Sequence, residues 1–347
     1  MSPYVIPILL LGMGLGTTAT LVSSHWLLAW MGLELNTVAI IPLMARRHHP
    51  RAVEATTKYF LIQAAAAALL LFASVSNAWL SGEWHIQQMT HPLPSTMMVL
   101  ALALKIGLAP LHAWLPEVLQ GLDLTTGLIL STWQKIAPMA LLLQINLETP
   151  TIFVLLGVAS TLIGGWGGLN QTQLRKVLAY SSIAHLGWMI LILQFSPSLT
   201  LLNLTVYFVM TISTFLIFNY LSSTNISTLA SSWTKAPILA SIAPFTLLSL
   251  GGLPPLTGFA PKWLILQELT KQGLPLIATI AALSALLSLY FYLRLTYAMT
   301  LTISPNTTIN SAPWRFSNRA STLPLIMMTM GAILLLPLMP AGLALLP

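Results

Sequence analysis

The feature that most constrains the fold is a succession of apolar stretches, each long enough to cross a lipid bilayer. A helix needs about 20 apolar residues to span the hydrocarbon core. Inside that core the backbone must satisfy its own hydrogen bonds, so each stretch is expected to form a helix. The sequence therefore predicts an all-α polytopic membrane protein with about 11 transmembrane helices, in a single membrane domain over residues 1–347. The predicted spans are 3–23, 25–44, 56–80, 95–116, 125–146, 151–169, 175–194, 199–221, 237–262, 274–297 and 323–345.

Composition supports a membrane protein and narrows its chemistry. Hydrophobic residues make up 56% of the chain and charged residues only 6%, more apolar surface than one soluble core has to bury. The lack of cysteine excludes disulfides, thiolate-held iron–sulfur clusters and cysteine-ligated zinc within this chain. The net charge of +7 comes from basic residues scattered between apolar runs. That placement is typical of topology determinants, so no nucleic-acid partner is expected.

The basic residues also orient the chain. With the N-terminus on the inner side, nearly all basic residues outside the spans lie in inner loops or at the span ends beside them. The positive-inside rule then predicts an inner N-terminus and an outer C-terminus. Pro3–Val22 lacks a basic n-region and a cleavage site, so we expect a retained first helix. The inner basic residues are Arg46, Arg47, Arg51, Lys58, Arg175, Lys176, Lys235, Arg294, Arg315 and Arg319, and the outer loops carry only Lys271.

One segment occurs twice, once in each half of the chain. Gly107–Glu117 and Gly252–Lys262 align without gaps and share Gly, Leu, Pro, Leu and Pro, with an aromatic residue opposite an aromatic residue. Proline removes an N–H and clashes with the preceding turn, so each copy is expected to break a helix within the membrane. Paired interruptions of this kind are typical of transport sites, although two ordinary proline kinks are the simpler alternative. The prolines concerned are Pro110, Pro116, Pro254, Pro255 and Pro261.

The copies define two repeats and two broken helices. The first half covers about 1–222 with a broken helix over 95–120, and the second about 235–347 with a broken helix over 237–270.

Besides the basic residues at the inner span ends, four charged residues lie within the predicted spans, namely Glu34, Lys105, Lys135 and Lys262. A charge at the bilayer centre costs about 2.5–3.5 kcal/mol on insertion scales, and such residues usually mark ion or proton pathways. A lysine suits proton storage because burial disfavours its charged form while a nearby carboxylate favours it. The alternative for each lysine is snorkelling from a helix end, most plausibly for Lys262.

Two histidines could pass protons between these lysines, because imidazole titrates near neutral pH. His112 lies inside the first repeated segment and His185 in the middle of the seventh predicted span. The alternative is that each is a hydrogen-bonded packing residue. No metal site is expected.

The motifs resemble those of a known family. Trp30–Asn36, Lys105–Glu117 and Ser131–Pro138 resemble the proton-pumping, antiporter-like membrane subunits of respiratory complex I. The predicted helix number, Leu178–His185 and Gly251–Phe259 narrow the resemblance to the chain 2 subunits of mitochondrial NADH–ubiquinone oxidoreductase. In animals these subunits resemble their bacterial relatives minus three N-terminal helices. The resemblance covers essentially the whole chain.

The resemblance implies a fold and a set of roles. It implies two inverted five-helix repeats, each with a broken helix, and a hydrated axis of ionisable residues along the bilayer midplane. On that basis Glu34 and Lys105 form the charged pair, Lys135 is the connecting lysine, and Lys262 serves the second half. Lys105 precedes its repeated segment whereas Lys262 ends the other, so the halves are not chemically equivalent.

The resemblance also implies a function. The chain would move protons from the matrix to the intermembrane space as a subunit of the H⁺-translocating NADH:ubiquinone reductase of the inner mitochondrial membrane. NAD, FMN, iron–sulfur clusters and ubiquinone would be handled by other subunits, and no redox chemistry would occur in this chain. Its partners would be lipid and the other membrane and supernumerary subunits. The alternatives are a stand-alone cation/proton antiporter and a passive membrane scaffold, and quinone reduction within the chain is the weakest interpretation.

The charge alternation predicts which loops share one side of the membrane. We expect Arg46–Arg51 and Thr302–Ser321 to face the same compartment, opposite Ser81–Pro94. Single cysteines introduced into the three loops should therefore label from opposite sides in sealed vesicles. Labelling of either basic loop from the Ser81–Pro94 side would contradict this topology.

Overall fold

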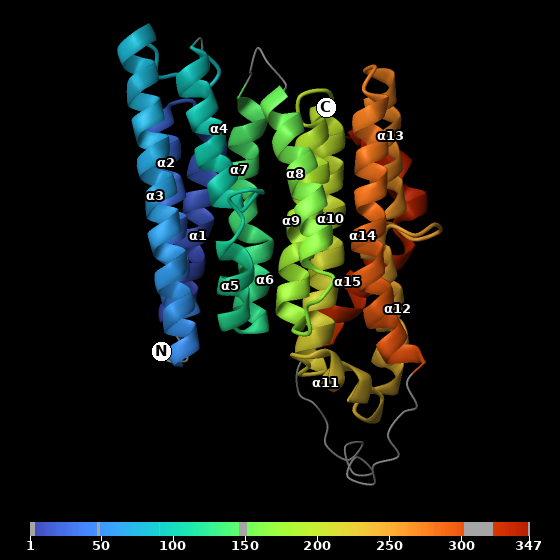
Figure 1. The fold of residues 1–347 in the computed structure, drawn as a ribbon. Helices are drawn as coiled ribbons and strands as arrows, with labels where there is room; N and C mark the ends of the chain where they lie inside the picture. Colours follow the sequence, from blue (N-terminus) through green and yellow to red (C-terminus); the bar gives the residue numbers. More distant parts are fainter. Residues whose placement is uncertain (1–3, 47–48, 90, 146–150, 302–321, 346–347) are drawn as a thin grey trace. The chain divides into compact units, whose positions relative to one another are not determined.

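The computed structural model describes residues 4–46, 49–89, 91–145, 151–301 and 322–345, and in these ranges the chain is helical (Figure 1). Within them no strand forms, and the only β-type pairings are isolated bridges, His25 with His85 and Gln173 with Asn225. The chain is thus an all-helical membrane protein. Of the basic loops expected to face inward, Thr302–Ser321 and the pair Arg47 and His48 lie outside the described residues.

The chain divides into two compact units, Met1–Gly157 and Val158–Pro347, with the boundary inside helix α8. The first unit contains α1 (Val5–Val22), α2 (Trp26–Met44), α3 (Pro50–Ser81), α4 (Pro92–Ile106), α5 (Trp114–Gly121), α6 (Leu124–Ser131), α7 (Trp133–Gln144) and the start of α8 (Thr151–Gly167). The second unit contains α9 (Leu174–Ile192), α10 (Pro197–Tyr220), α11 (Ile226–Ala230), η1 (Ser231–Thr234), α12 (Pro237–Gly251), α13 (Phe259–Lys271), α14 (Pro275–Thr300), α15 (Leu323–Leu334), η4 (Leu336–Leu338) and α16 (Met339–Leu345).

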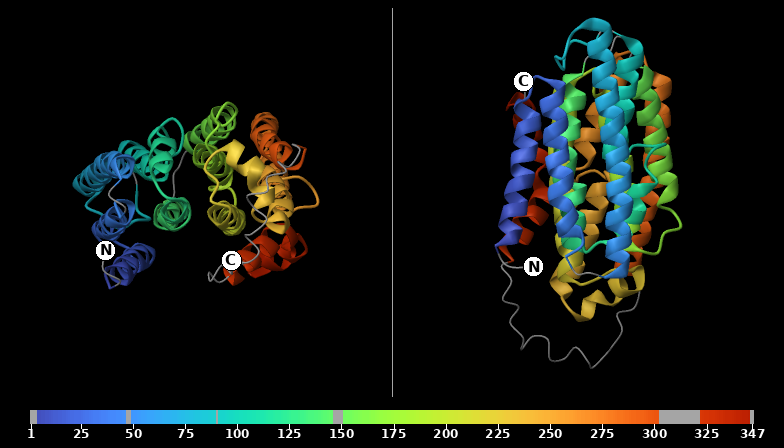
Figure 2. Two further views of the ribbon diagram at one scale, coloured as in Figure 1. Left: turned by 90° about the horizontal axis from the view of Figure 1, so that it is seen from below. Right: turned by 90° about the vertical axis from the view of Figure 1, so that its left-hand side faces the viewer.

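Helices that are neighbours in the sequence pack together in the first unit, whereas the packing in the second unit also joins helices further apart in the sequence. In the first unit α1 packs on α2, α2 on α3 and α3 on α4, and the end-on view of Figure 2 shows these helices side by side. In the second unit α12 packs against α10, α14 and α15, and α13 packs against α9, α10 and α14. Packing buries nearly every residue of α9 from Val177 to Ile192, while large apolar side chains on other helices, such as Leu11, Phe72 and Leu286, stay exposed. An exposed apolar surface of this kind suits a lipid environment.

Each predicted span overlaps one helix or a pair of helices. By length and composition, α1, α2, α3, α10 and α14 are candidate spans, and α15 with the helix after it forms a sixth that is bent by 69°. The other predicted spans coincide with shorter apolar helices, with helices divided by a break, as at α4 and α12, or with the continuous helix α9. Among the described residues, length and composition therefore identify five helices that could cross a membrane, or six spans if the bent pair counts as one, against the predicted number of about 11.

The first repeated segment contains the non-helical break between α4 and α5. Gly107 has φ +85°, and the N–H groups of Gly107 and Leu108 both donate to the Ala103 carbonyl at 2.9 Å. Glycine adopts this left-handed conformation without the Cβ penalty, and it ends the helix with its last carbonyls partly satisfied. Pro110 follows in the non-helical segment, after a cis peptide bond.

The second repeated segment has the same geometry between α12 and α13. Gly252 has φ +80°, and the N–H groups of Gly252 and Leu253 donate to the Leu248 carbonyl at 3.1 and 3.3 Å. Pro254 and Pro255 lie in the non-helical segment, with a cis bond between them. The aligned glycine therefore ends the helix in both copies.

The last proline of each copy was expected to help break the helix, but it lies at the start of the next helix. Pro116 lies in the first turn of α5 and Pro261 in the first turn of α13. The first N–H groups of a helix have no intrahelical partner, so a proline there costs no hydrogen bond. These two prolines start the second half-helices and do not break them.

The second break folds back tightly onto the helix that it ends. A Cβ added to Gly258 would lie 1.8 Å from the Ser249 carbonyl oxygen of α12. The neighbouring Thr257 hydroxyl donates to the Ala332 carbonyl of α15 at 2.6 Å. The chain at the break is thus fixed against two helices, and only glycine fits between the break and α12.

Gly258→Ala should accordingly destabilise the subunit, because the added methyl meets backbone rather than a movable side chain. Overpacking costs roughly 1–3 kcal/mol, and more where the backbone must shift. We expect a clear loss of assembled complex on native gels. Gly14→Ala is the matched control, because nothing lies within 4 Å of its added methyl. Equal assembly of the two variants would contradict the packing described here.

Candidate functional site

A buried ion pair lies at the end of the first broken helix. Lys105, in the last turn of α4, has its Nζ 3.8 Å from Oε1 of Glu34 on α2. The Lys105 side chain is 2% exposed and that of Glu34 is 30% exposed. A charge-assisted hydrogen bond is about 2.7–2.9 Å long, so the two groups attract each other without being hydrogen-bonded. The Glu34 carboxylate is held by Thr37, whose Oγ1 lies 3.0 Å from Oε2.

Two side chains fix the end of α4 and so position Lys105. Gln63 on α3 donates from Nε2 to the Lys105 carbonyl at 3.2 Å, and Trp114 on α5 donates from Nε1 to the Leu104 carbonyl at 3.1 Å. The last carbonyls of a helix lack intrahelical partners, and in hydrocarbon each needs one. Lys105 is therefore carried by a helix end that is tied to both neighbouring elements.

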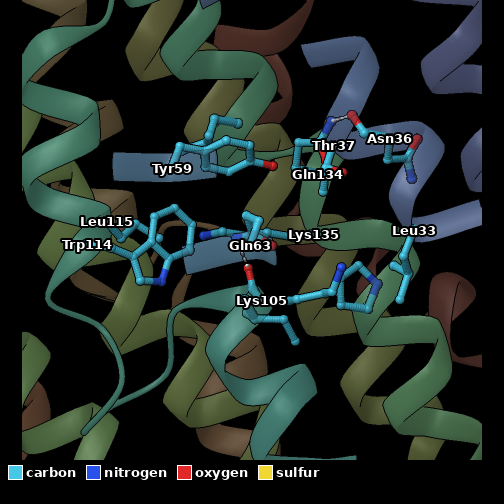
Figure 3. A pocket seen from close by; sticks show the side chains of 13 residues that line it. Leu33, Asn36, Thr37, Tyr59, Gln63, Lys105, Trp114, Leu115, Gln134 and Lys135 are labelled. Atoms are coloured by element: carbon cyan, nitrogen blue, oxygen red, sulfur yellow. Dashed lines mark hydrogen bonds between the residues drawn. The ribbon is translucent and has the colours of Figure 1, made fainter. Parts of the chain in front are cut away.

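Lys105 shares a small cavity with Lys135 (Figure 3). The cavity has a volume of about 20 Å³, room for roughly one water molecule, and its polar walls offer the partners that such a water needs. Lys135 is buried at the start of α7, immediately after the chain leaves α6. The lining residues are Leu33, Asn36, Thr37, Tyr59, Gln63, Lys105, Ile106, Trp114, Leu115, Leu130, Gln134, Lys135 and Pro138.

The structure thus brings three of the four predicted charged residues together. Glu34, Lys105 and Lys135 come from α2, α4 and α7 of the first unit. His112 lies in the non-helical break, where its Nδ1 is 3.3 Å from the Pro110 carbonyl, and it does not line the cavity. The arrangement places two buried lysines at one cavity, with a carboxylate beside the first of them.

Lys262 belongs to the second unit and has different surroundings. It lies near the start of α13, and its Nζ donates to the Gly251 carbonyl at 2.7 Å and to the Leu250 carbonyl at 3.3 Å. It also borders an apolar cavity of about 450 Å³. His185 on α9 is buried, with its ring 5.6 Å from that of Tyr207, and it does not line this cavity.

Several polar residues of the site escaped the sequence reasoning. Asn36, Tyr59, Gln63 and Gln134 line the cavity, and the Gln134 Nε2 donates to the Asn36 carbonyl at 3.4 Å. Each interrupts an apolar stretch, which is the signal that pointed to the charged residues. A search for amide and phenol side chains inside the apolar stretches, and not only for charged ones, would have found these four residues.

Comparison with known protein families covers almost the whole chain. Residues 23–288 match the model for the transmembrane region of NADH:quinone oxidoreductase and Mrp antiporter subunits. Residues 289–343 match the model for the C-terminus of NADH dehydrogenase subunit 2. Both lysines of the cavity, Glu34 and Lys262 fall within the first match.

Curated relatives are similar along their full length. The chain is 70% identical to NADH-ubiquinone oxidoreductase chain 2 of Tetraodon nigroviridis over 345 residues, covering 99% of each chain. It is 67% identical to the protein of the same name from Oncorhynchus mykiss over 350 residues, covering 100% of this chain and 99% of that one.

Solved structures share the fold. A chain of respiratory complex I from Thermus thermophilus matches with TM-score 0.87 and 27% identity, over 99% of this chain and 80% of that one. A chain of the Mrp complex from Dietzia matches with TM-score 0.84 and 16% identity, over 97% and 76%, and shows the fold alone. The chain therefore belongs to the NADH-ubiquinone oxidoreductase chain 2 family of respiratory complex I membrane subunits.

Proposed function

We infer that this chain translocates protons across the inner mitochondrial membrane as a subunit of respiratory complex I. Electron transfer from NADH to ubiquinone in other subunits would drive the movement, from the matrix to the intermembrane space. The observation that carries this proposal is the small, partly polar cavity shared by Lys105 and Lys135, with Glu34 at 3.8 Å from the Lys105 amine. A structural protein would have no use for two buried amines around room for one water.

The Glu34–Lys105 pair supplies a means of changing proton affinity. The two groups are close enough to attract each other, yet no hydrogen bond locks them. Moving the carboxylate from 3.8 Å to about 8 Å would change the Coulomb energy by roughly 2 kcal/mol at an effective dielectric constant of about 20. Moving one charge through 100 mV costs about 2.3 kcal/mol, which is comparable. A displacement of this size would thus change the proton affinity of Lys105 by an amount comparable to the cost of moving its proton against the membrane potential.

The remaining parts of the proposal concern route and topology. Lys135 would take the proton from Lys105 through the cavity water, and Lys262 would carry it in the second half, with His112 and His185 as relay groups. Eleven spans in two inverted repeats, an N-terminus in the matrix and a C-terminus in the intermembrane space would frame this route. The chain would bind no redox cofactor and would contact lipid and the other membrane and supernumerary subunits of the complex.

The charge of Glu34 can be tested by Glu34→Gln. The change is nearly isosteric, so we expect the complex to assemble. Removing the charge that favours protonated Lys105 should lower NADH-driven proton pumping by about tenfold, since each 1.36 kcal/mol is a factor of ten in rate. Pumping would be measured in proteoliposomes with a fluorescent pH probe. Unchanged pumping by an assembled complex would refute the role of this pair.

Variants of Lys135 distinguish a proton pump from a passive scaffold. A buried lysine costs about 2.5–3.5 kcal/mol to insert, so Lys135→Met should leave assembly intact or slightly improved. It should nevertheless lower proton pumping and, through coupling, NADH oxidation. Lys135→Arg should also impair both, because a guanidinium keeps its proton near neutral pH.

The matched control is Lys271→Met, the same change at a lysine whose side chain is 62% exposed. It should pump normally. Normal pumping by Lys135→Arg would mean that Lys135 acts as a fixed charge, and normal pumping by Lys135→Met would favour a scaffold.

A further inference from the structure

Each broken helix ends in carbonyl groups that need partners, and a side chain provides one in both halves. In α4, Gln63 Nε2 donates to the Lys105 carbonyl at 3.2 Å. In α12, Lys262 Nζ donates to the Leu250 carbonyl at 3.3 Å and to the Gly251 carbonyl at 2.7 Å. Lys105 and Leu250 occupy the same place in the two copies, two residues before the glycine that ends the helix. The carbonyl at this position therefore accepts a hydrogen bond from a side-chain amide in the first copy and from a side-chain amine in the second.

Lys262 bridges its own break. It belongs to α13, and its amine reaches back across the non-helical segment to the end of α12. Gly252 leaves room for this path, since an added Cβ would lie 2.8 Å from Cδ and 2.9 Å from Nζ of Lys262. The lysine thus ties the two half-helices together. Gln63, in contrast, reaches α4 from α3, a separate helix, and the first break is bridged by Trp114 of α5, whose indole does not titrate.

The two caps respond differently to protons. The C-terminal end of a helix carries a partial negative charge and favours a cation. A charge-assisted hydrogen bond is roughly twice as strong as a neutral one, so a protonated amine holds the carbonyls more strongly than a neutral amine. The amide of Gln63 does not titrate. Only the cap on α12 depends on whether its donor carries a proton.

The surroundings of Lys262 offer its charge little else. Within the described residues of the second unit, no carboxylate lies within ion-pair distance of its amine, and Glu268 on the same helix pairs with Lys271. Apart from Lys262 itself, the cavity beside it is lined by apolar residues and glycines. The described titratable side chains on the three helices packed against α13 are Arg175, Lys176, Tyr180 and His185 on α9, Tyr207 and Tyr220 on α10, and Tyr290, Tyr292, Arg294 and Tyr297 on α14, and none of them lines that cavity.

We propose that Lys262 is a positioning residue whose proton holds the second broken helix together, whereas Gln63 caps the first break whatever the protonation state. When Lys262 is protonated, the end of α12 is fixed to α13, and when the proton leaves, the end of α12 loosens. This deepens the function proposed above, on which the assignment of Lys262 as a proton carrier rests. Proton occupancy and the order of the break would then change together.

Hydrogen–deuterium exchange on the intact complex in lipid nanodiscs tests this directly. The segments to compare are 246–258 and 101–113, which contain the two breaks, between about pH 6 and pH 10 and after correction for intrinsic exchange rates. The amides of Gly252 and Leu253 should lose protection by roughly threefold or more as the pH rises, because a neutral amine holds the helix end less well. Protection around Gly107 should not change.

Three variants separate the proton from the hydrogen bond. Lys262→Met removes the donor, so protection at the second break should be low at every pH. Lys262→Gln keeps a neutral donor, so protection should be intermediate and independent of pH. Gln63→Leu is the matched control and should loosen the first break equally at all pH values. Should Lys262→Met fail to assemble, Lys262→Gln carries the test.

The outcomes separate this inference from the proposed function. Protection at Gly252 that is independent of pH in the natural chain would overturn the inference, as would a Lys262→Gln variant that keeps the pH dependence. Proton pumping is measured separately on the same samples. Normal pumping by Lys262→Gln, with the pH dependence abolished, would remove Lys262 from the proton route and leave the helix cap standing.

Discussion

The whole structure depends on one constraint, which is that a backbone passing through hydrocarbon must satisfy every N–H and C=O from within the protein. Continuous helices meet it alone, but the breaks after Ile106 and Gly251 cannot. At both, a glycine in the left-handed conformation lets the following N–H groups fold back on the last turn. Side chains then supply further donors, Gln63 at the first break and Lys262 at the second. Each of these donors lies at a break because the carbonyls that end the helix there need a partner.

The candidate proton site follows from the same requirement. Once α4 ends within the membrane, the space beside its last turn has to contain polar groups, and Lys105 projects from that turn. A buried amine needs a countercharge, and Glu34 provides it at 3.8 Å from a neighbouring helix. A pair optimised only for stability would close to hydrogen-bond distance. The looser pair, beside room for one water, suits a group whose charge has to change during a working cycle.

The helices could be predicted from the sequence because most spans are long, continuous apolar stretches. Both breaks could be located because the pattern of glycine and proline occurs twice. The sequence analysis attributed both breaks to proline alone, because the spacing of the prolines does not show at which residue the next helix starts. A proline such as Pro116 is tolerated in the first turn of an α-helix, where it lies here, and breaks a helix only when it lies in a later turn. The partners of Lys105 and Lys262 lie far away in sequence or are backbone carbonyls. No pattern of residues encodes a backbone carbonyl as a ligand, so this part of the site required coordinates.

The two copies show how one backbone device can serve different chemistry. At the position after the last proline, the first copy has Glu117, which forms an ion pair of 2.9 Å with Lys58 on the exposed side of α3. The second copy has Lys262, which turns inward to the carbonyls of α12. In the first half, the charged group and the helix cap are separate residues, Lys105 and Gln63, so a proton can come and go while the break stays fixed. In the second half we propose that Lys262 performs both tasks, so that a proton leaving it would change how the helix end is held.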